Sequence, residues 1–199
     1  MIDMQGIFTH PDYAGTVIQF NSSNCNWSIF KTLHKKVANN KCPFCETELD
    51  TTNQGSSATI DHFRPQASSM YPFLKCEPKN YILMCSICNT RYKKSKFPLV
   101  DESKRATTAG TITATSSEQP LLFNPAEKKP LDFFELAFRK TEIGNILELK
   151  RKNTISKNSY DYQCCEAMIN LFGLGYVHKD IHPDKETKKL RIDILTAHY

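Results

Sequence analysis

Two pairs of cysteines with the same internal spacing are the residues of this chain whose arrangement most clearly indicates chemistry. Cys42 and Cys45 form C-P-F-C, Cys85 and Cys88 form C-S-I-C, and the whole set reads C-x2-C-x39-C-x2-C. Four thiolates bind Zn²⁺ tetrahedrally and leave no coordination position for water. A redox role is the alternative for a C-x-x-C pair, but two pairs without βαβ units favour zinc. We therefore expect a structural Zn²⁺ ion whose binding contributes directly to folding.

The segment between the two cysteine pairs carries side chains suited to the hydrolysis of a phosphodiester bond. Residues 58–65 read A-T-I-D-H-F-R-P, Asn80 precedes a second apolar run, and Asn89 follows the last cysteine. The reaction needs a base that activates water and a cation that stabilises the leaving oxygen. His62 is suited to be that base because imidazole titrates near neutral pH. Taken singly, Asp61-His62 reads as a surface pair, Asn80 as a turn residue and Asn89 as a helix cap. Together and in this order, these residues favour a catalytic site.

A short strand, a second strand and a helix must position these residues. The β-branched run predicts a strand over 58–61, and a second apolar run predicts another over 81–84. A helix is expected to begin at residue 88 or 89 and to continue to about 96, where Phe97-Pro98 ends it. Strand alternation puts Asp61 and His62 on opposite faces while the strand stays regular. If the strand ends there, both side chains can border one groove.

The order of these elements between the cysteines resembles the HNH endonuclease (His-Me finger) family over residues 42–98. The matching residues are His62, Asn80 and Asn89, the last in place of the third histidine. The resemblance implies an α+β fold with a zinc-stapled ββα-metal core, flanking helices and a possible β-hairpin. It implies His62 as the general base, and Asp61 with Asn89 as oxygen ligands of one catalytic Mg²⁺ or Mn²⁺ ion. It also implies that Asn80 is a structural residue that fixes the loop carrying His62 and orients its imidazole.

Positive charge is concentrated near the expected helix. The net charge of the chain is +5, and the stretch from Lys75 to Arg105 carries the same excess, with eight basic and three acidic residues. Such a field suits a polyanion, although a solvated lysine-rich face is the simpler explanation. Contact with nucleic-acid phosphates is expected from four residues: Arg91, Lys93, Lys94 and Lys96. DNA and RNA offer the same phosphodiester, so the sequence does not distinguish them.

The rest of the chain divides around this core. A helix is expected over 27–37, residues 1–24 read as extended or irregular, and a helix is expected over 159–172. Residues 134–138 and 146–150 predict a hairpin, with a helix over 131–140 as the alternative. The predicted divisions are an N-terminal segment and helix (1–40), the nuclease core (41–100), a flexible Ser/Thr-rich loop (101–118) and a C-terminal mixed or helical subdomain (119–199).

The sequence around the core narrows the resemblance to the HNH subunits of Septu-type and retron-associated antiphage defence systems. The runs that carry it are Y-P-F-L-K-C-E-P-K-N-Y-I-L-M-C-S-I-C-N, F-P-L-V and Q-P-L-L-F-N-P. It implies a partner, an ABC-type ATPase that restrains or directs the nuclease. The N-terminal helix and the C-terminal helices, including a helix-like run over 188–199, are the expected docking surfaces.

A second class of function stays open: a non-catalytic, zinc-stabilised nucleic-acid-binding or adaptor module. The joint presence of Asp61, His62 and Asn89 argues against it. No apolar run is long enough to span a membrane, and the N-terminal M-I-D-M-Q-G-I-F does not resemble a secretory signal, so a cytoplasmic protein is expected. The cysteines outside the two pairs are expected to be buried apolar residues: Cys25, Cys76, Cys164 and Cys165.

Overall fold

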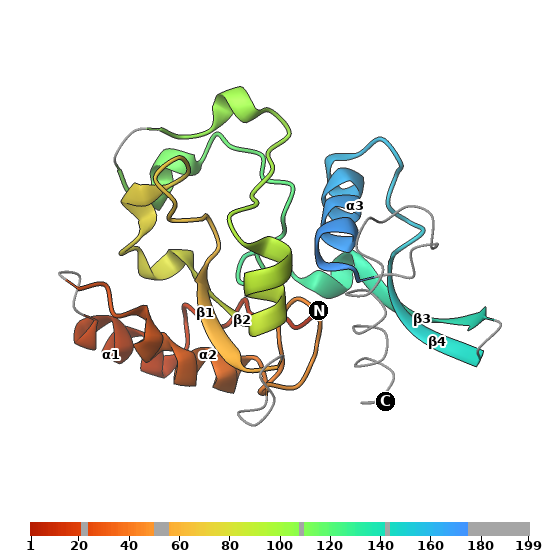
Figure 1. The fold of residues 1–199 in the computed structure, drawn as a ribbon, viewed down its shortest axis with the longest axis horizontal. Coiled ribbons are helices and arrows are strands. Elements are labelled where there is room, and N and C mark those ends of the chain that lie inside the picture. The colour runs from red at the N-terminus through yellow and green to blue at the C-terminus, as the bar shows by residue number, and fades with distance from the viewer. Residues whose placement is uncertain (21–23, 50–55, 108–109, 142–143, 175–199) are drawn as a thin grey trace.

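The computed structural model describes residues 1–20, 24–49, 56–107, 110–141 and 144–174, and the statements below concern these residues. The helix-like run over 188–199 lies outside them. In chain order the elements are α1 (Pro11–Gln19), η1 (Trp27–Phe30), α2 (Lys31–Val37), β1 (Ala58–His62), η2 (Pro72–Leu74), η3 (Pro78–Asn80), β2 (Tyr81–Cys85), η4 (Ile87–Lys93), η5 (Glu102–Lys104), η6 (Ile112–Thr115), η7 (Pro130–Asp132), β3 (Phe134–Thr141), β4 (Gly144–Arg151) and α3 (Tyr160–Phe172). The η elements are 3-10 helices except η4, which is a π-helix. The architecture is therefore a mixture of helices and two small sheets (Figure 1).

The two central strands carry the Asp-His dipeptide. β1 pairs with β2 antiparallel, in a register that sets Asp61 opposite Ile82 and His62 opposite Tyr81. β1 thus stays regular through His62, one residue beyond the predicted end. Since successive strand side chains point to opposite faces, Asp61 and His62 lie on opposite faces of the pair. The arrangement in which both side chains border one groove is not the one observed.

Helices cover both faces of this strand pair. On one face, η1 and α2 contact β1, and the ring of His62 packs against Trp27 of η1. On the other face, Asn89 and Lys93 of η4 bond to side chains of β1. β2 is buried along its whole length. In Figure 1 the strands lie between α2 and the yellow-green η4 helix, so the functional residues sit within a packed layer.

The N-terminal segment contains a helix where the sequence predicts an extended or irregular run. α1 is specified by its first turn: the His10 ring accepts a hydrogen bond from the Asp12 backbone N–H, and Pro11 occupies the first helical position. No residue of α1 is fully buried, and its contact with the core comes from the partly buried Tyr13 and Val17, four residues apart. Ahead of it, Met4 and Ile7 are buried in the core.

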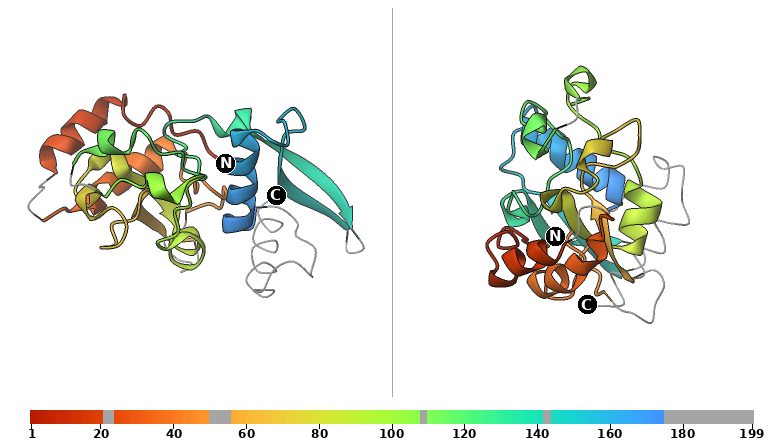
Figure 2. Two further views of the ribbon diagram at one scale, coloured as in Figure 1. Left: turned by 90° about the horizontal axis from the view of Figure 1, so that it is seen from above. Right: turned by 90° about the vertical axis from the view of Figure 1, so that its left-hand side faces the viewer.

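The C-terminal part of the described chain is a hairpin and a helix. β3 and β4 pair antiparallel, which confirms the predicted hairpin and shows that the alternative helix over 131–140 is wrong. α3 begins at the Ser159 cap and ends at Gly173, whose φ of 62° is left-handed. In Figures 1 and 2, α3 stands between the β1–β2 part and the hairpin. Phe172 of α3 stacks on Phe44, with ring centroids 4.8 Å apart, and this contact joins α3 to the first cysteine pair.

Two of the four cysteines outside the C-x-x-C pairs are joined by a disulfide bond. Cys25 and Cys76 form a disulfide with their Cα atoms 5.1 Å apart, which corrects the prediction of apolar packing for both. Cys164 and Cys165 are buried thiols of α3, as predicted. In the described part of the chain, helices fall short of the length and apolar character that a membrane span requires.

Candidate functional site

The four cysteines of the two C-x-x-C pairs form one buried cluster. Their Sγ atoms all lie within 4.8 Å of one another. Cys42 Sγ is 3.7 Å from Cys88 Sγ, and Cys45 Sγ is 3.7 Å from Cys85 Sγ. Zn–S bonds of about 2.3 Å in a tetrahedron place sulfurs about 3.8 Å apart. Both the donor chemistry and the spacing therefore fit a four-coordinate metal ion such as Zn²⁺.

Backbone groups around the cluster are arranged for thiolate ligands. The Cys85 N–H points at Cys42 Sγ at 3.3 Å, and the Cys88 N–H points at Cys85 Sγ at 3.4 Å. N–H donors stabilise negative sulfur and orient it toward a metal ion. Without a cation, burial raises the pKa of the Cys42 thiol. A bound cation would reverse that preference, because it favours the thiolate form.

His62 is held from two sides. Its Nε2 lies 2.9 Å from the Lys75 carbonyl oxygen, and its ring packs edge-on against Trp27 at 5.0 Å and Tyr81 at 5.2 Å. A carbonyl only accepts, so Nε2 carries the hydrogen and Nδ1 of the neutral ring keeps its lone pair. Burial lowers the pKa of His62, while the Lys75 carbonyl and Asp61 oppose the shift. The residue is 3% exposed, so little of its ring reaches the surface.

Asn80 fastens the chain that leaves β1. Its Oδ1 accepts from the Arg64 backbone N–H at 2.8 Å, and its Nδ2 donates to the carbonyls of Arg64 at 2.9 Å and Leu74 at 3.3 Å. The Asn80 backbone carbonyl also accepts from the Phe63 N–H at 2.7 Å. Through these bonds one buried amide connects the start of β2 to the two residues that follow His62.

Asp61 and Asn89 lie on the same face of β1, but each bonds to a different residue. Asp61 Oδ2 accepts from Lys93 Nζ at 2.7 Å, and Asn89 Nδ2 donates to Thr59 Oγ1 at 3.1 Å. Thr59 and Asp61 are two residues apart on β1 and so share one face, and Asn89 and Lys93 are four residues apart on η4. Residues four apart on a helix lie on the same side, so Asn89 and Lys93 both face β1. A carboxylate and an amide oxygen are hard ligands that fit Mg²⁺ or Mn²⁺.

Lys93 differs from the other basic residues predicted to contact phosphate. It is fully buried, and besides Asp61 its Nζ donates to the His62 carbonyl at 2.8 Å. Burial lowers the pKa of Lys93, and the Asp61 carboxylate opposes that shift. Arg91, Lys94 and Lys96 are exposed, as a phosphate-contacting surface requires. Lys93 is therefore a residue of the site and is not part of that surface.

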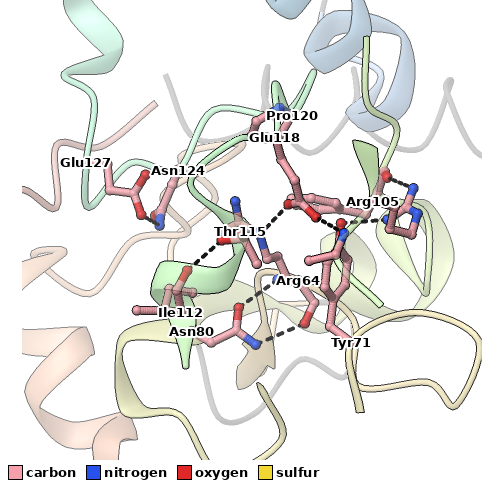
Figure 3. A network of polar contacts seen from close by, with 12 residues as sticks. Arg64, Tyr71, Asn80, Arg105, Ile112, Thr115, Glu118, Pro120, Asn124 and Glu127 are labelled. Carbon is pink, nitrogen blue, oxygen red and sulfur yellow. Dashed lines mark hydrogen bonds and ion pairs between the residues drawn. The ribbon is translucent and has the colours of Figure 1, made fainter. Parts of the chain in front are cut away.

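A buried polar network holds the segment that follows β1 at Arg64 and Tyr71 (Figure 3). Arg64 Nε donates to Glu118 Oε2 at 3.0 Å, and Glu118 Oε1 accepts from the Ala106 N–H at 2.8 Å. Arg105 donates to the Tyr71 hydroxyl at 2.7 Å. Arg64 is thus engaged inside the protein. Segment 101–118 was predicted to be a flexible loop. Its described residues include η5 and η6, and Arg105 and Glu118 bond it to the segment that follows β1.

Sequence reasoning missed three supports of His62: the Lys75 carbonyl, the Trp27 ring and the Cys25–Cys76 disulfide. A backbone carbonyl leaves no residue-type signal, and two cysteines 51 residues apart have no recognisable spacing. The disulfide connects them, because Cys25 stands two residues before Trp27 and Cys76 directly follows Lys75. His34 is buried and both of its ring nitrogens lack a hydrogen-bond partner; burial lowers its pKa to about 4. His178, His182 and His198 lie outside the described residues.

We expect the four-cysteine cluster to be required for folding. The apparent binding free energy of structural Zn²⁺ is of order 10 kcal/mol, comparable with the whole stability of a domain. Cys85→Ser should therefore lose the metal and the cooperative thermal transition, measured by elemental analysis and circular dichroism. Cys164→Ser is the matched control, since this buried thiol lies outside the cluster, and it should keep both the metal and a cooperative transition. A zinc-free Cys85→Ser protein with an unchanged transition would contradict the assignment.

Asn80→Ala should destabilise the protein by about 3 kcal/mol or more, because it strands two carbonyls and one N–H in the interior at about 1–3 kcal/mol each. Denaturant unfolding measures the loss. Asn24→Ala, which removes one exposed hydrogen bond to Asn26, is the control and should cost under about 1 kcal/mol. Equal losses for the two variants would show that Asn80 does not fix the loop.

Reduction of the Cys25–Cys76 disulfide should loosen Trp27 from His62. Trp27 is the only tryptophan of the chain, so its fluorescence reports on this contact alone. We expect a shift of emission to longer wavelength on mild reduction, as the half-buried indole gains water. Cys25→Ser/Cys76→Ser should show the shifted spectrum without reductant and no further response. A reductant-induced shift of the same size in the double variant would assign the change to another bond.

Comparison with known proteins places this geometry in context. The chain is 34% identical over 141 residues to Septu protein PtuB of Bacillus mycoides (strain KBAB4). That match covers 65% of the chain and 45% of the PtuB sequence, so the chain spans less than half of its relative. Family models gave no match, and neither did solved structures. Over the matched length, the chain is similar to Septu protein PtuB.

Proposed function

We propose that the chain is a metal-dependent HNH endonuclease that hydrolyses nucleic-acid phosphodiester bonds. The observation that carries the proposal is the convergence of separate supports on the end of β1. Asn80 fixes the backbone after His62, the Lys75 carbonyl fixes its ring, and η4 lays Asn89 and Lys93 over the face that holds Asp61. The strand–strand–helix order and the four-cysteine cluster support a zinc-stapled ββα-metal core.

In this mechanism His62 is the general base. Its Nδ1 lone pair takes a proton from the attacking water, and the Nε2–H···O=C bond to Lys75 holds the ring and stabilises the imidazolium that results. Asp61 and Asn89 would hold the Mg²⁺ or Mn²⁺ ion, which, when bound, supplies charge stabilisation at the phosphate and the leaving oxygen. Because Asp61 and His62 lie on opposite faces of β1, the scissile phosphate is placed across the end of the strand. The exposed Arg91, Lys94 and Lys96 are the proposed contacts for flanking phosphates.

The second candidate is a non-catalytic, zinc-stabilised nucleic-acid-binding or adaptor module. One observation favours it: His62 is 3% exposed, and a base must reach water and substrate. Trp27 is the more exposed of the two rings against His62, and its displacement would open the site. The nuclease proposal therefore includes movement of Trp27, whereas an adaptor needs none.

We also propose a role in antiphage defence, in complex with an ABC-type ATPase resembling PtuA. The similarity to Septu protein PtuB supports it. Among the described residues, the two most exposed large apolar side chains are Ile18 of α1 at 84% and Phe138 of β3 at 79%. Phe138 and Leu136, which is 53% exposed, are two residues apart on β3 and so share one face of the hairpin. We propose this face and α1 as the contacts for the partner protein. The ATPase is proposed to restrain or direct the nuclease.

Cleavage of plasmid DNA and of RNA, with Mg²⁺ or Mn²⁺ and with and without the ATPase, tests the function. His62→Ala should remain folded and lose cleavage by about 10²-fold or more. His10→Asn is the control histidine, because it keeps the cap of α1 and lies outside the site. Activity in His62→Ala equal to wild type rejects the base. Inactivity of the wild type on both substrates, even with the ATPase, favours the adaptor.

The pH dependence tests the same base independently. Burial lowers the pKa of His62 below its ordinary value of 6.5, and the base works unprotonated. Cleavage should therefore rise with pH through an acidic limb centred below 6.5 and level off at neutral pH. An acidic limb centred above 6.5 would contradict the environment described for His62.

A further inference from the structure

Lys93 is placed where a cation is needed at the proposed site. Its ammonium lies 2.7 Å from Asp61 Oδ2 and 2.8 Å from the His62 carbonyl, and no part of the side chain reaches the surface. A lysine is seldom buried unless it is paired. Here one ammonium joins the side chain of Asp61 to the backbone of His62, the two adjacent residues to which the mechanism assigns the metal ion and the base.

Surrounding side chains show why this contact is more than a helix-to-strand ion pair. Asn89, the other proposed oxygen ligand, stands four residues before Lys93 on η4 and directs its amide NH₂ to Thr59. Asp61 is partly exposed, with 14% of its side chain accessible, and Lys93 covers it from inside. An ion arriving at the exposed side would therefore meet a carboxylate that already carries a counter-ion. Two cations on one carboxylate repel each other, and the repulsion is strong where water is excluded.

We propose that Lys93 is a positioning residue that acts as the resident counter-ion of Asp61, and that the divalent ion binds in competition with its ammonium. This inference rests on the proposed function, because it takes Asp61 as a metal ligand. In the metal-free protein Lys93 neutralises Asp61 and holds the end of β1 through the His62 carbonyl. When the divalent ion binds, the same ammonium lowers its affinity. Lys93 thus keeps the end of β1 ordered in the metal-free protein and lowers the affinity of the site for the divalent ion.

The test measures Mn²⁺ binding by electron paramagnetic resonance of the free ion, on zinc-loaded protein without nucleic acid. Lys93→Met removes the charge, so Mn²⁺ should bind about 10-fold more tightly, one unit of log Kd. Cleavage should nevertheless fall, because the His62 carbonyl loses its donor. A purely structural role predicts weaker Mn²⁺ binding together with weaker cleavage. Lys93→Arg, which keeps the charge, should bind Mn²⁺ like the wild type.

Further variants keep the outcome interpretable. Lys93→Gln removes the charge but retains an N–H donor for the His62 carbonyl, and it replaces Lys93→Met if that variant does not fold. Lys104→Met is the matched control, since Lys104 is exposed and lies outside the proposed site, so its loss should leave Mn²⁺ affinity unchanged. Thermal unfolding confirms that each variant is folded.

Asp61→Asn distinguishes the counter-ion role of Lys93 from the metal-ligand role of Asp61. If Asp61→Asn loses Mn²⁺ binding while Lys93→Met and Lys93→Gln bind no more tightly than wild type, the counter-ion role is overturned and the proposed metal ligand stands. If Asp61→Asn binds Mn²⁺ as well as the wild type, Asp61 is not a ligand, and the inference falls together with that part of the proposed function. Tighter binding in both neutral variants and lost binding in Asp61→Asn is the expected result.

Discussion

Four buried sulfur atoms within 4.8 Å of one another are the constraint on which the rest of this structure depends. They come from a tight turn after α2, from the end of β2 and from the first turn of η4. One metal ion at their centre would fix the direction of β2 relative to η4. Phe44, inside the first cysteine pair, stacks on Phe172, so the same centre also sets the position of α3. Because the four sulfurs complete a tetrahedron, such an ion has no position for substrate and serves the fold only.

The second organising feature is the end of β1, where two adjacent residues serve opposite faces of one strand. His62 belongs to the side of Trp27 and Tyr81, and Asp61 belongs to the side of η4. The supports come from distant parts of the chain: a carbonyl from the loop before β2, an amide at the start of β2 and an ammonium from η4. Each bonds to backbone or ring atoms and restricts movement. Such preorganisation allows a small site to hold a base beside a cation.

The sequence predicted the elements whose signals are local. The apolar β-branched runs marked β1 and β2, the cysteine spacing marked the metal cluster, and Asp61-His62 lay at the strand end as expected. α1 was missed because it is only nine residues long and its core contact, through Tyr13 and Val17, is too short to mark a helix in the sequence. The opposite directions of Asp61 and His62 depended on how far β1 stayed regular, which alternation alone does not determine. The pairing of Lys93 with Asp61 depends on how η4 packs on β1, and a run of basic residues gives no sign of it.

Two ions are proposed to have separate roles, one among the sulfurs for the fold and one beside Asp61 for chemistry. Anomalous X-ray diffraction from crystals of the zinc-loaded protein soaked in Mn²⁺, collected at the absorption edges of both metals, tests this directly. We expect a zinc peak at the centre of Cys42, Cys45, Cys85 and Cys88, and a separate manganese peak beside the Asp61 carboxylate. Zinc away from the four sulfurs, or no manganese near Asp61 in well-ordered crystals, would rule out the two-ion arrangement.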